Sequence, residues 1–262
     1  MAAGRKTLRG CFFAAVLALI MIVVMIGALI AVLAGRVDFP SNEPVPEDVP
    51  PAHGAQPPAI DIDAPGRTSV ALYEWAAPIA ADTGISVPAL AAYANAQLIA
   101  EKSWPDCHLN WTTLAGIGYV ETRHGTYTSK LLGSKPSIDD NGFVTPIIVG
   151  VPLDGSPGFA EIRDTDQGKW DGDSEYDRAV GPMQFIPETF RTIGIDANGD
   201  GVADPNQIDD AAASAARYLC LDGRDLDTPQ GWTKAIYAYN HSGDYLVKVR
   251  NAAAHYALRE HP

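Results

Sequence analysis

Residues 110–127 read NWTTLAGIGYVETRHGTY, and this stretch predicts the helix around which the fold is built. Asn110 suits the N-cap of a helix that runs from about Trp111 to Arg123, and Gly125 suits its terminator. Glu121 falls on the same side of that helix as the apolar residues, so its carboxyl group is expected to be buried. Burial disfavours the charged form and raises the pKa of a carboxyl group. The alternative is a structural Glu121 that pairs with Arg123 or another cation at the helix end.

Helical patterns also dominate most of the chain after Thr68. Ser86 precedes a run rich in Ala, Leu and Gln up to Lys102, which predicts a capped helix. Asp204 and Pro205 suit the cap and first turn of a helix that would end near Gly223. Two more helices are expected at about 229–240 and 244–258. Residues 126–180 instead contain many Gly, Pro and Asp around one apolar stretch, 143–151, that suits a short hairpin. The pattern predicts a mainly α (α+β) domain with a loop-rich insertion, and such insertions usually line a site.

Three blocks of sequence occur in a fixed order on this framework. They read GIGYVETRHGTY at 116–127, RAVGPMQFIPETF at 178–190 and AIYAYNHSGDY at 235–245. Together they resemble the lytic murein transglycosylases, in particular the membrane-bound B-like group, with the lysozyme-like fold of the soluble transglycosylase domain. The resemblance covers most of residues 84–246.

The resemblance implies a role for each block. It implies that Glu121 is the general acid and base, and that Met183, Gln184, Tyr239 and Asn240 shape the sugar cleft or position Glu121 and the substrate. Each of these four also has a structural alternative, such as core packing for Met183 and Tyr239. The family motif commonly has Ser after the glutamate, where this chain has Thr122, which keeps the hydroxyl group and adds a methyl.

The reaction that the resemblance implies is cleavage of the β-1,4 bond between N-acetylmuramic acid and N-acetylglucosamine, with a 1,6-anhydro product. One carboxylate serves both steps, and no cofactor is required. Hydrolysis of the lysozyme type is the alternative and needs a second carboxylate. A non-catalytic peptidoglycan-binding module and a calcium-stabilised adhesin or scaffold are further alternatives. The candidates for a second carboxylate are Asp173, Glu175, Asp177 and Glu188.

The first part of the chain predicts a membrane anchor. Residues 11–34 are uncharged and mostly apolar, which is longer than the roughly 20 residues that span a bilayer. Basic residues before this run place residues 1–10 in the cytoplasm by the positive-inside rule. A cleaved signal peptide is the alternative. Residues 35–67 are rich in Pro and predict an extended linker, and residues 68–262 form the expected catalytic domain. The chain is thus expected to be a single-pass membrane protein whose domain faces the cell wall.

Charge and cysteine content narrow the partners. The chain carries a formal charge of −13, and every acidic residue follows Arg36, which argues against a nucleic-acid partner. Peptidoglycan strands and the cytoplasmic membrane are the expected partners. Cys107 and Cys220 lie in the oxidising compartment, where a disulfide between them is favoured over two free thiols. The chain has no CxxC, HExxH or paired-His spacing, so no zinc site is expected.

Residues 196–204 read DANGDGVAD and resemble a calcium-binding loop. Gln207 stands where such a loop usually has its bidentate Glu, so a complete EF-hand is not expected, although Asp209 or Asp210 could replace it. The alternative is a metal-free turn before the next helix. A weaker acidic cluster comprises Asp164, Asp166, Asp171 and Asp173. The candidate ligands of a structural Ca²⁺ are Asp196, Asn198, Asp200, Asp204 and the carbonyl group of Val202.

Overall fold

The computed structural model describes residues 47–127 and 134–262. These described residues belong to one compact unit. Its elements are η1 (Thr68–Leu72), α2 (Tyr73–Thr83), α3 (Val87–Ser103), η2 (Pro105–Cys107), α4 (Trp111–Thr122), β1 (Ser137–Ile138), β2 (Val144–Thr145), β3 (Val149–Pro152), β4 (Arg178–Val180), α5 (Pro187–Ile193), α6 (Ile208–Leu219), η3 (Leu221–Gly223), α7 (Pro229–Tyr239) and α8 (Gly243–Ala257).

The expected mainly helical fold is confirmed, and four of the expected helices begin at side-chain caps. The side chains of Ser86, Asn110, Thr228 and Ser242 accept backbone N–H groups in the first turns of α3, α4, α7 and α8. The expected span at 11–34 lies outside the described residues. No helix within the described ranges is long and apolar enough to cross a membrane.

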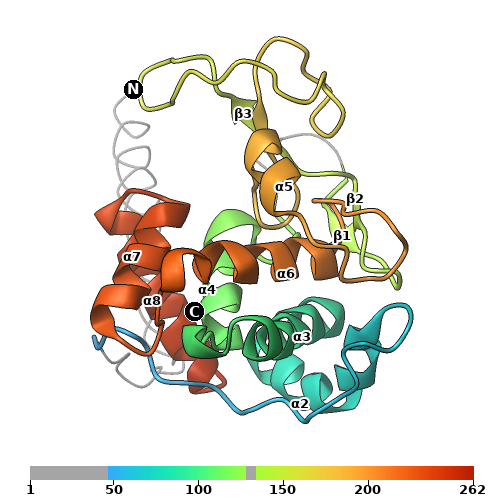
Figure 1. The fold of residues 1–262 in the computed structure, drawn as a ribbon, viewed down its shortest axis with the longest axis vertical. Coiled ribbons are helices and arrows are strands. Elements are labelled where there is room, and N and C mark those ends of the chain that lie inside the picture. Colours follow the sequence, from blue (N-terminus) through green and yellow to red (C-terminus); the bar gives the residue numbers. More distant parts are fainter. Residues whose placement is uncertain (1–46, 128–133) are drawn as a thin grey trace, which may run out of the picture. The chain divides into compact units, whose positions relative to one another are not determined.

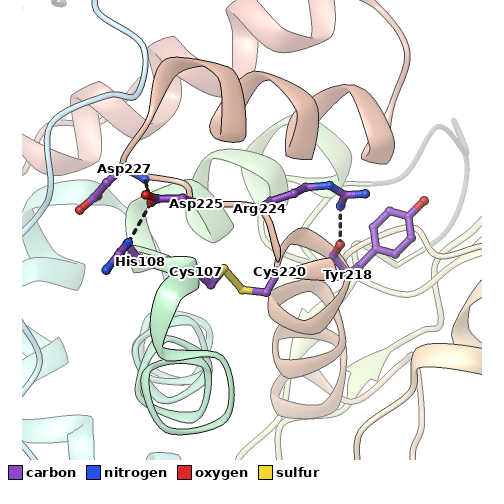
Figure 2. Close-up of a disulfide and its surroundings, with 7 residues drawn as sticks. All are labelled: Cys107, His108, Tyr218, Cys220, Arg224, Asp225 and Asp227. Carbon is purple, nitrogen blue, oxygen red and sulfur yellow. Dashed lines mark hydrogen bonds and ion pairs between the residues drawn. A yellow bond between two sulfur atoms is a disulfide. The ribbon is translucent and has the colours of Figure 1, made fainter. Parts of the chain in front are cut away.

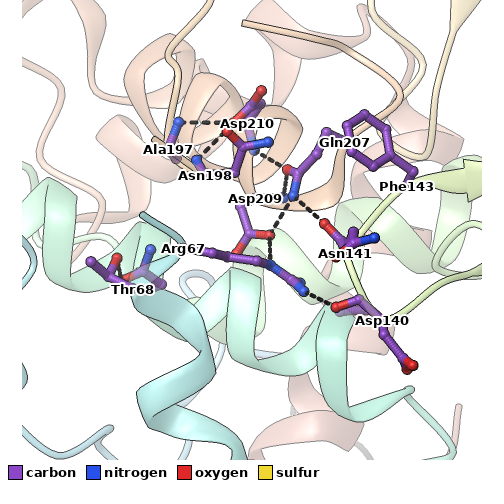
Figure 3. Close-up of polar contacts among 12 residues, drawn as sticks. Arg67, Thr68, Asp140, Asn141, Phe143, Ala197, Asn198, Gln207, Asp209 and Asp210 are labelled. Atoms are coloured by element: carbon purple, nitrogen blue, oxygen red, sulfur yellow. Dashed lines mark hydrogen bonds and ion pairs between the residues drawn. The ribbon is translucent and has the colours of Figure 1, made fainter. Parts of the chain in front are cut away.

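Helix α6 begins later than the sequence predicts. The expected cap, Asp204, accepts the N–H of Asn206 in a turn, and Pro205 precedes the helix. The side chain of Gln207 caps the helix instead, because its Oε1 accepts the N–H groups of Asp209 and Asp210. Gln207 is fully buried, and its Nε2 also donates to the carbonyl group of Asn141 in the insertion (Figure 3). The side chain that caps this helix is thus also held by a contact with the insertion.

Helix α4 lies at the centre of the helices, with α3, α6 and α8 around it (Figure 1). Its approach to α8 requires glycine, because a Cβ at Gly116 would lie 2.7 Å from the carbonyl oxygen of Val249. Just after α4, the buried His124 links two other helices. Its Nδ1 lies 3.2 Å from the hydroxyl of Tyr93 on α3, and its Nε2 lies 2.7 Å from the hydroxyl of Tyr256 on α8. Burial lowers the pKa of His124 to about 3, so the ring is neutral and can donate at one nitrogen and accept at the other.

The segment before η1 differs from the expected linker. Of the expected linker 35–67, residues 35–46 lie outside the described part of the chain, and the rest packs against the helical domain without regular secondary structure. The indole N–H of Trp111 donates to the carbonyl group of Ala55 at 2.9 Å, and Gly54 N–H donates to Asn110. At the other end, the Arg67 guanidinium lies 2.6 Å from the buried carboxylate of Asp209 (Figure 3). These polar contacts hold a segment that has few apolar side chains, so the packed domain begins before Thr68.

The insertion between α4 and α5 also differs in its pairing. Residues 143–151 do not form a hairpin with themselves. Strand β2 pairs antiparallel with β1 (Ser137↔Thr145), and β3 pairs antiparallel with β4 (Val149↔Val180). Val144, Ile148 and Val180 are buried, so each short strand pairs with the neighbour that keeps these side chains on the core.

The expected disulfide between Cys107 and Cys220 is confirmed (Figure 2). It joins η2 to the end of α6, and its cysteines are 113 residues apart in the sequence. Polar contacts surround it: Leu226 N–H donates to the carbonyl group of Cys107, and the His108 ring lies 2.8 Å from Asp225. The disulfide therefore links η2 to the end of α6 covalently and closes the long loop between them.

Breaking this disulfide is expected to destabilise the domain, because the unfolded chain would regain the freedom of a long closed loop. The loss is roughly 4 kcal/mol, or a fall in Tm of roughly 10 °C. Thermal unfolding with and without a reductant measures it. The double variant Cys107→Ala/Cys220→Ala is the control, and its Tm should not respond to the reductant. An unchanged Tm for the reduced wild-type protein would contradict this expectation.

Candidate active site

A cleft of about 450 Å³ lies between the insertion and the helices. One wall comes from β3 and the turn that follows it, and the other comes from α4, α6 and α7. The residues that line the cleft are Glu121, Gly150, Val151, Leu153, Phe159, Ala179, Gln184, Phe185, Ile186, Thr189, Tyr218, Ala238, Tyr239 and Asn240. The cleft thus contains three of the four residues expected to bind sugar, together with the expected catalytic glutamate.

Glu121 lies in the last turn of α4 and is bound by one tyrosine. The hydroxyl of Tyr245 donates to Glu121 Oε1 at 2.6 Å. Burial raises the pKa of Glu121 to about 7, and the bond from Tyr245 opposes this rise because it stabilises the carboxylate. Glu121 as a whole is half-buried because it also lines the cleft, so the expected burial is confirmed in part. With this pKa the carboxyl group can both give and take a proton at neutral pH.

Tyr245 is the residue that sequence reasoning missed. Ser242 caps α8 and accepts the N–H of Tyr245, which fixes this tyrosine in the first turn of the helix. The two partners of the bond are 124 residues apart in the sequence. Tyr245 is the last residue of the third sequence block, AIYAYNHSGDY, so its position is a signal, although nothing local links it to Glu121.

Thr122 connects α4 to the loop that carries Gln184. Its hydroxyl donates to the carbonyl group of Pro182 at 2.6 Å and accepts the N–H of Gly125. The side chain is buried, so the structure accommodates the methyl group that distinguishes Thr from Ser. In the same loop Gly181 has φ +74°, and a Cβ there would lie 1.9 Å from the carbonyl oxygen of Pro205. Only glycine therefore fits at this turn.

Gln184 and Met183 have different surroundings. Gln184 has φ +50°, lines the cleft, and donates from Nε2 to the carbonyl group of Gly181 at 2.9 Å. The side chain of Met183 is fully buried in the core and does not line the cleft. Its backbone oxygen instead accepts a hydrogen bond from the hydroxyl of Tyr239. Met183 thus contributes a carbonyl group and core packing, and its expected contact with sugar stays a prediction.

Tyr239 and Asn240 are both at the cleft, at the end of α7. The Tyr239 hydroxyl donates to the backbone oxygen of Met183 at 2.7 Å, and not to Glu121. Burial and the nearby charge of Glu121 raise the pKa of Tyr239 well above its usual value, so it stays protonated. Asn240 is exposed at the C-cap of α7 and lines the cleft. Its position leaves the amide accessible to a ligand.

None of the candidates for a second carboxylate lines the cleft. Asp173 pairs with Arg178 at 2.8 Å, and Glu175 lies 3.5 Å from Arg163. Asp177 is fully buried and accepts hydrogen bonds from the backbone and hydroxyl of Thr165. Glu188 is exposed in the first turn of α5. Glu121 is therefore the one acidic residue among the described residues that line this cleft.

The loop 196–204 is held by its own hydrogen bonds. Asp196 accepts the N–H groups of Gly199, Asp200 and Gly201, and Asp210 accepts those of Ala197, Asn198 and Asp204. Within the described ranges, one group of three acidic side chains has oxygen atoms within 4.8 Å of one another, namely Asp164, Asp166 and Asp177. The loop 196–204 provides no such group. Calcium at this loop therefore stays a prediction, and no step below uses it.

Comparison with known proteins gives one match. Residues 162–234 match a family model described as a transglycosylase SLT domain. This segment contains Met183 and Gln184 but neither Glu121 nor Tyr245. No curated protein and no solved structure matches the chain. The match supports a domain of the lytic transglycosylase type that acts on peptidoglycan, and it does not single out the membrane-bound B-like group.

Removal of the Tyr245 hydroxyl is expected to raise the pKa of Glu121 further. The Tyr245→Phe variant loses the hydrogen bond that favours the carboxylate, so the titration should move to higher pH by about one pH unit. Carbon-13 NMR of the labelled glutamate side chains measures this titration. Tyr239→Phe is the matched control, because its hydroxyl binds Met183, and it should leave the Glu121 titration nearly unchanged. Equal shifts in both variants would contradict a specific role for Tyr245.

The buried carboxyl group is also expected to make stability depend on pH. Because the folded-state pKa of about 7 lies above the usual 4.5, the folded protein holds this proton more tightly than the unfolded chain. Stability is therefore lost as the pH rises from 4.5 through 7. Glu121→Gln removes this loss. The free energy of unfolding of the variant should therefore rise relative to that of the wild type, by up to about 3 kcal/mol, between pH 5 and pH 8. Urea unfolding at both pH values tests this, with exposed Glu188→Gln as the control. A constant difference between Glu121→Gln and wild type would count against it.

Proposed function

We propose that this protein is a lytic transglycosylase that cleaves the β-1,4 bond between N-acetylmuramic acid and N-acetylglucosamine and forms 1,6-anhydro ends. The observation that carries the proposal is that Glu121 is the one acidic residue among the described residues that line the cleft, and that its pKa is about 7. A hydrolase of the lysozyme type needs a second carboxylate within roughly 5 to 9.5 Å, on the opposite face of the sugar. The four candidates for that role do not line the cleft.

The proposed reaction uses Glu121 twice. The protonated carboxyl group first gives its proton to the glycosidic oxygen, and the bond from the muramoyl C1 to that oxygen breaks. The 2-acetamido group stabilises the positive charge that develops at C1. The Glu121 carboxylate then takes the proton of the C6 hydroxyl, whose oxygen forms the new bond to C1. The proton balance closes within one turnover, and no water is consumed.

The surroundings of Glu121 suit both steps. Burial keeps a large fraction of the carboxyl group protonated at neutral pH, as the first step requires. The hydrogen bond from Tyr245 stabilises the carboxylate that the first step leaves. Asn240 and Gln184 offer amide groups at the same cleft for the acetamido and hydroxyl groups of the sugars.

We also propose that residues 11–34 anchor the chain in the cell membrane, with the domain on the cell-wall side. The support is the uncharged run and the basic residues before it. Such an anchor would hold an enzyme of this kind next to the peptidoglycan that it remodels.

The products of digestion test the proposed reaction. Purified peptidoglycan is digested with the full-length protein, and the soluble products are analysed by mass spectrometry. We expect anhydromuropeptides from the wild type and none from Glu121→Gln, because the amide cannot donate or accept the proton.

Two results would overturn the proposal. Products heavier by about 18 Da, one water, would show a hydrolase of the lysozyme type. Intact peptidoglycan with both proteins would show a binding module. Retained binding of glycan by Glu121→Gln is the control for its folding.

A further inference from the structure

The turn that follows β3 forms a short, ordered hairpin at the edge of the cleft. Asp154 and Glu161 form an antiparallel bridge, and Ile162 N–H donates to the carbonyl group of Leu153 at 2.8 Å. The Asp154 carboxylate accepts both the N–H and the hydroxyl of Ser156. These bonds involve the backbone and the side chains of Asp154 and Ser156, and none of them involves the side chain of Phe159.

Phe159 is exposed at the end of this hairpin. Its N–H donates to the carbonyl group of Ser156 at 2.9 Å, which closes the tight turn before it. Its side chain is nevertheless 48% exposed and lines the same cleft as Glu121. The backbone thus presents an aromatic ring to solvent inside the cleft, although burial of a phenyl ring is favourable.

The two sides of the cleft differ in chemistry. The insertion contributes the apolar side chains of Val151, Leu153 and Phe159, and Val151 is also 48% exposed. The helices opposite contribute an alanine and two tyrosine rings, and they also carry the polar groups of Glu121 and Asn240. A pyranose ring matches this pair of walls, because its C–H groups gather on one face and its hydroxyl groups point to the rim. An apolar wall with a few polar groups opposite is also the usual composition of a ligand site.

We propose that Phe159 is a substrate-binding residue, whose ring stacks on the C–H face of a sugar bound next to Glu121. This inference rests on the proposed function, because it takes a glycan as the ligand of the cleft. Phe159 lies outside the segment 162–234 that matches the transglycosylase family model, and it belongs to the insertion of this chain. The insertion therefore supplies one wall of the glycan site.

Substitution of Phe159 should weaken binding and leave the chemistry intact. In the full-length protein, Phe159→Ala is expected to raise KM about tenfold with little change in kcat, because a phenyl ring takes no part in the proton transfers and binds substrate and transition state alike. Phe159→Tyr should keep wild-type KM, since it keeps the ring. Phe159→Leu should resemble Ala more than Tyr, because it is apolar but has no ring face. Val70→Ala is the matched control, since Val70 is 49% exposed on η1 and lies away from the cleft.

A binding experiment separates this inference from the proposed reaction. Soluble glycan strands are titrated into Glu121→Gln and into the double variant Glu121→Gln/Phe159→Ala by calorimetry. An increase in Kd of about tenfold in the double variant supports stacking, even if the wild type were to give no product. Equal Kd values, or an unchanged KM in Phe159→Ala, would overturn the role of Phe159. Equal losses in the Leu and Tyr variants would overturn stacking.

Discussion

The hydrogen bond from Tyr245 to Glu121 depends on one register between α4 and α8, and much of the structure serves to keep that register. Gly116 lets the two helices approach so closely that any side chain at this position would collide with the backbone of Val249. Below the carboxylate, the neutral ring of His124 bonds to Tyr256 on α8 and to Tyr93 on α3. A shift of either helix would break these contacts together, so the position of Glu121 is set by the packing of three helices.

The same arrangement explains how a carboxyl group can remain in such surroundings. A buried charge without a partner is costly, and the chain provides one neutral donor in place of a cation. A cation at this position would have lowered the pKa and left the group ionised. The tyrosine holds the carboxylate weakly enough for the acid form to persist at neutral pH. Within the described part of the chain, no other acidic residue lines the cleft, so no like charge from these lining residues raises the pKa of Glu121 further.

The sequence allowed the helices with local caps to be predicted, because a cap and the residues that it binds are neighbours in the chain. Ser86, Asn110, Thr228 and Ser242 all act in this way. Helix α2 was missed, since it contains Pro78 and begins without a side-chain cap. The predicted start of α6 is too early. The residue that caps this helix is Gln207, whose side chain also bonds to Asn141, far away in the sequence.

The residues of the site also fall into two groups, those that the sequence predicts and those that only the fold brings together. Glu121, Gln184, Tyr239 and Asn240 were found from short motifs, and the structure brings them to one cleft. Their partners could not be found in this way, since Tyr245 and the carbonyl group of Met183 meet them only through tertiary packing. The packed segment before η1 was missed for a different reason. Its composition suits a linker, and single polar contacts such as that of Arg67 with Asp209 hold it in place.

The disulfide between Cys107 and Cys220 closes a covalent ring that contains α4, the whole insertion and the loop of Gln184. Exposed loops such as those of the insertion are the usual sites of proteolytic nicking. A single cut anywhere inside this ring leaves two fragments that are still joined through the sulfur atoms. Glu121 and the wall that faces it would thus stay on one covalent assembly after such a cut. The bond would thus hold the parts of a nicked cleft together, in addition to stabilising the fold.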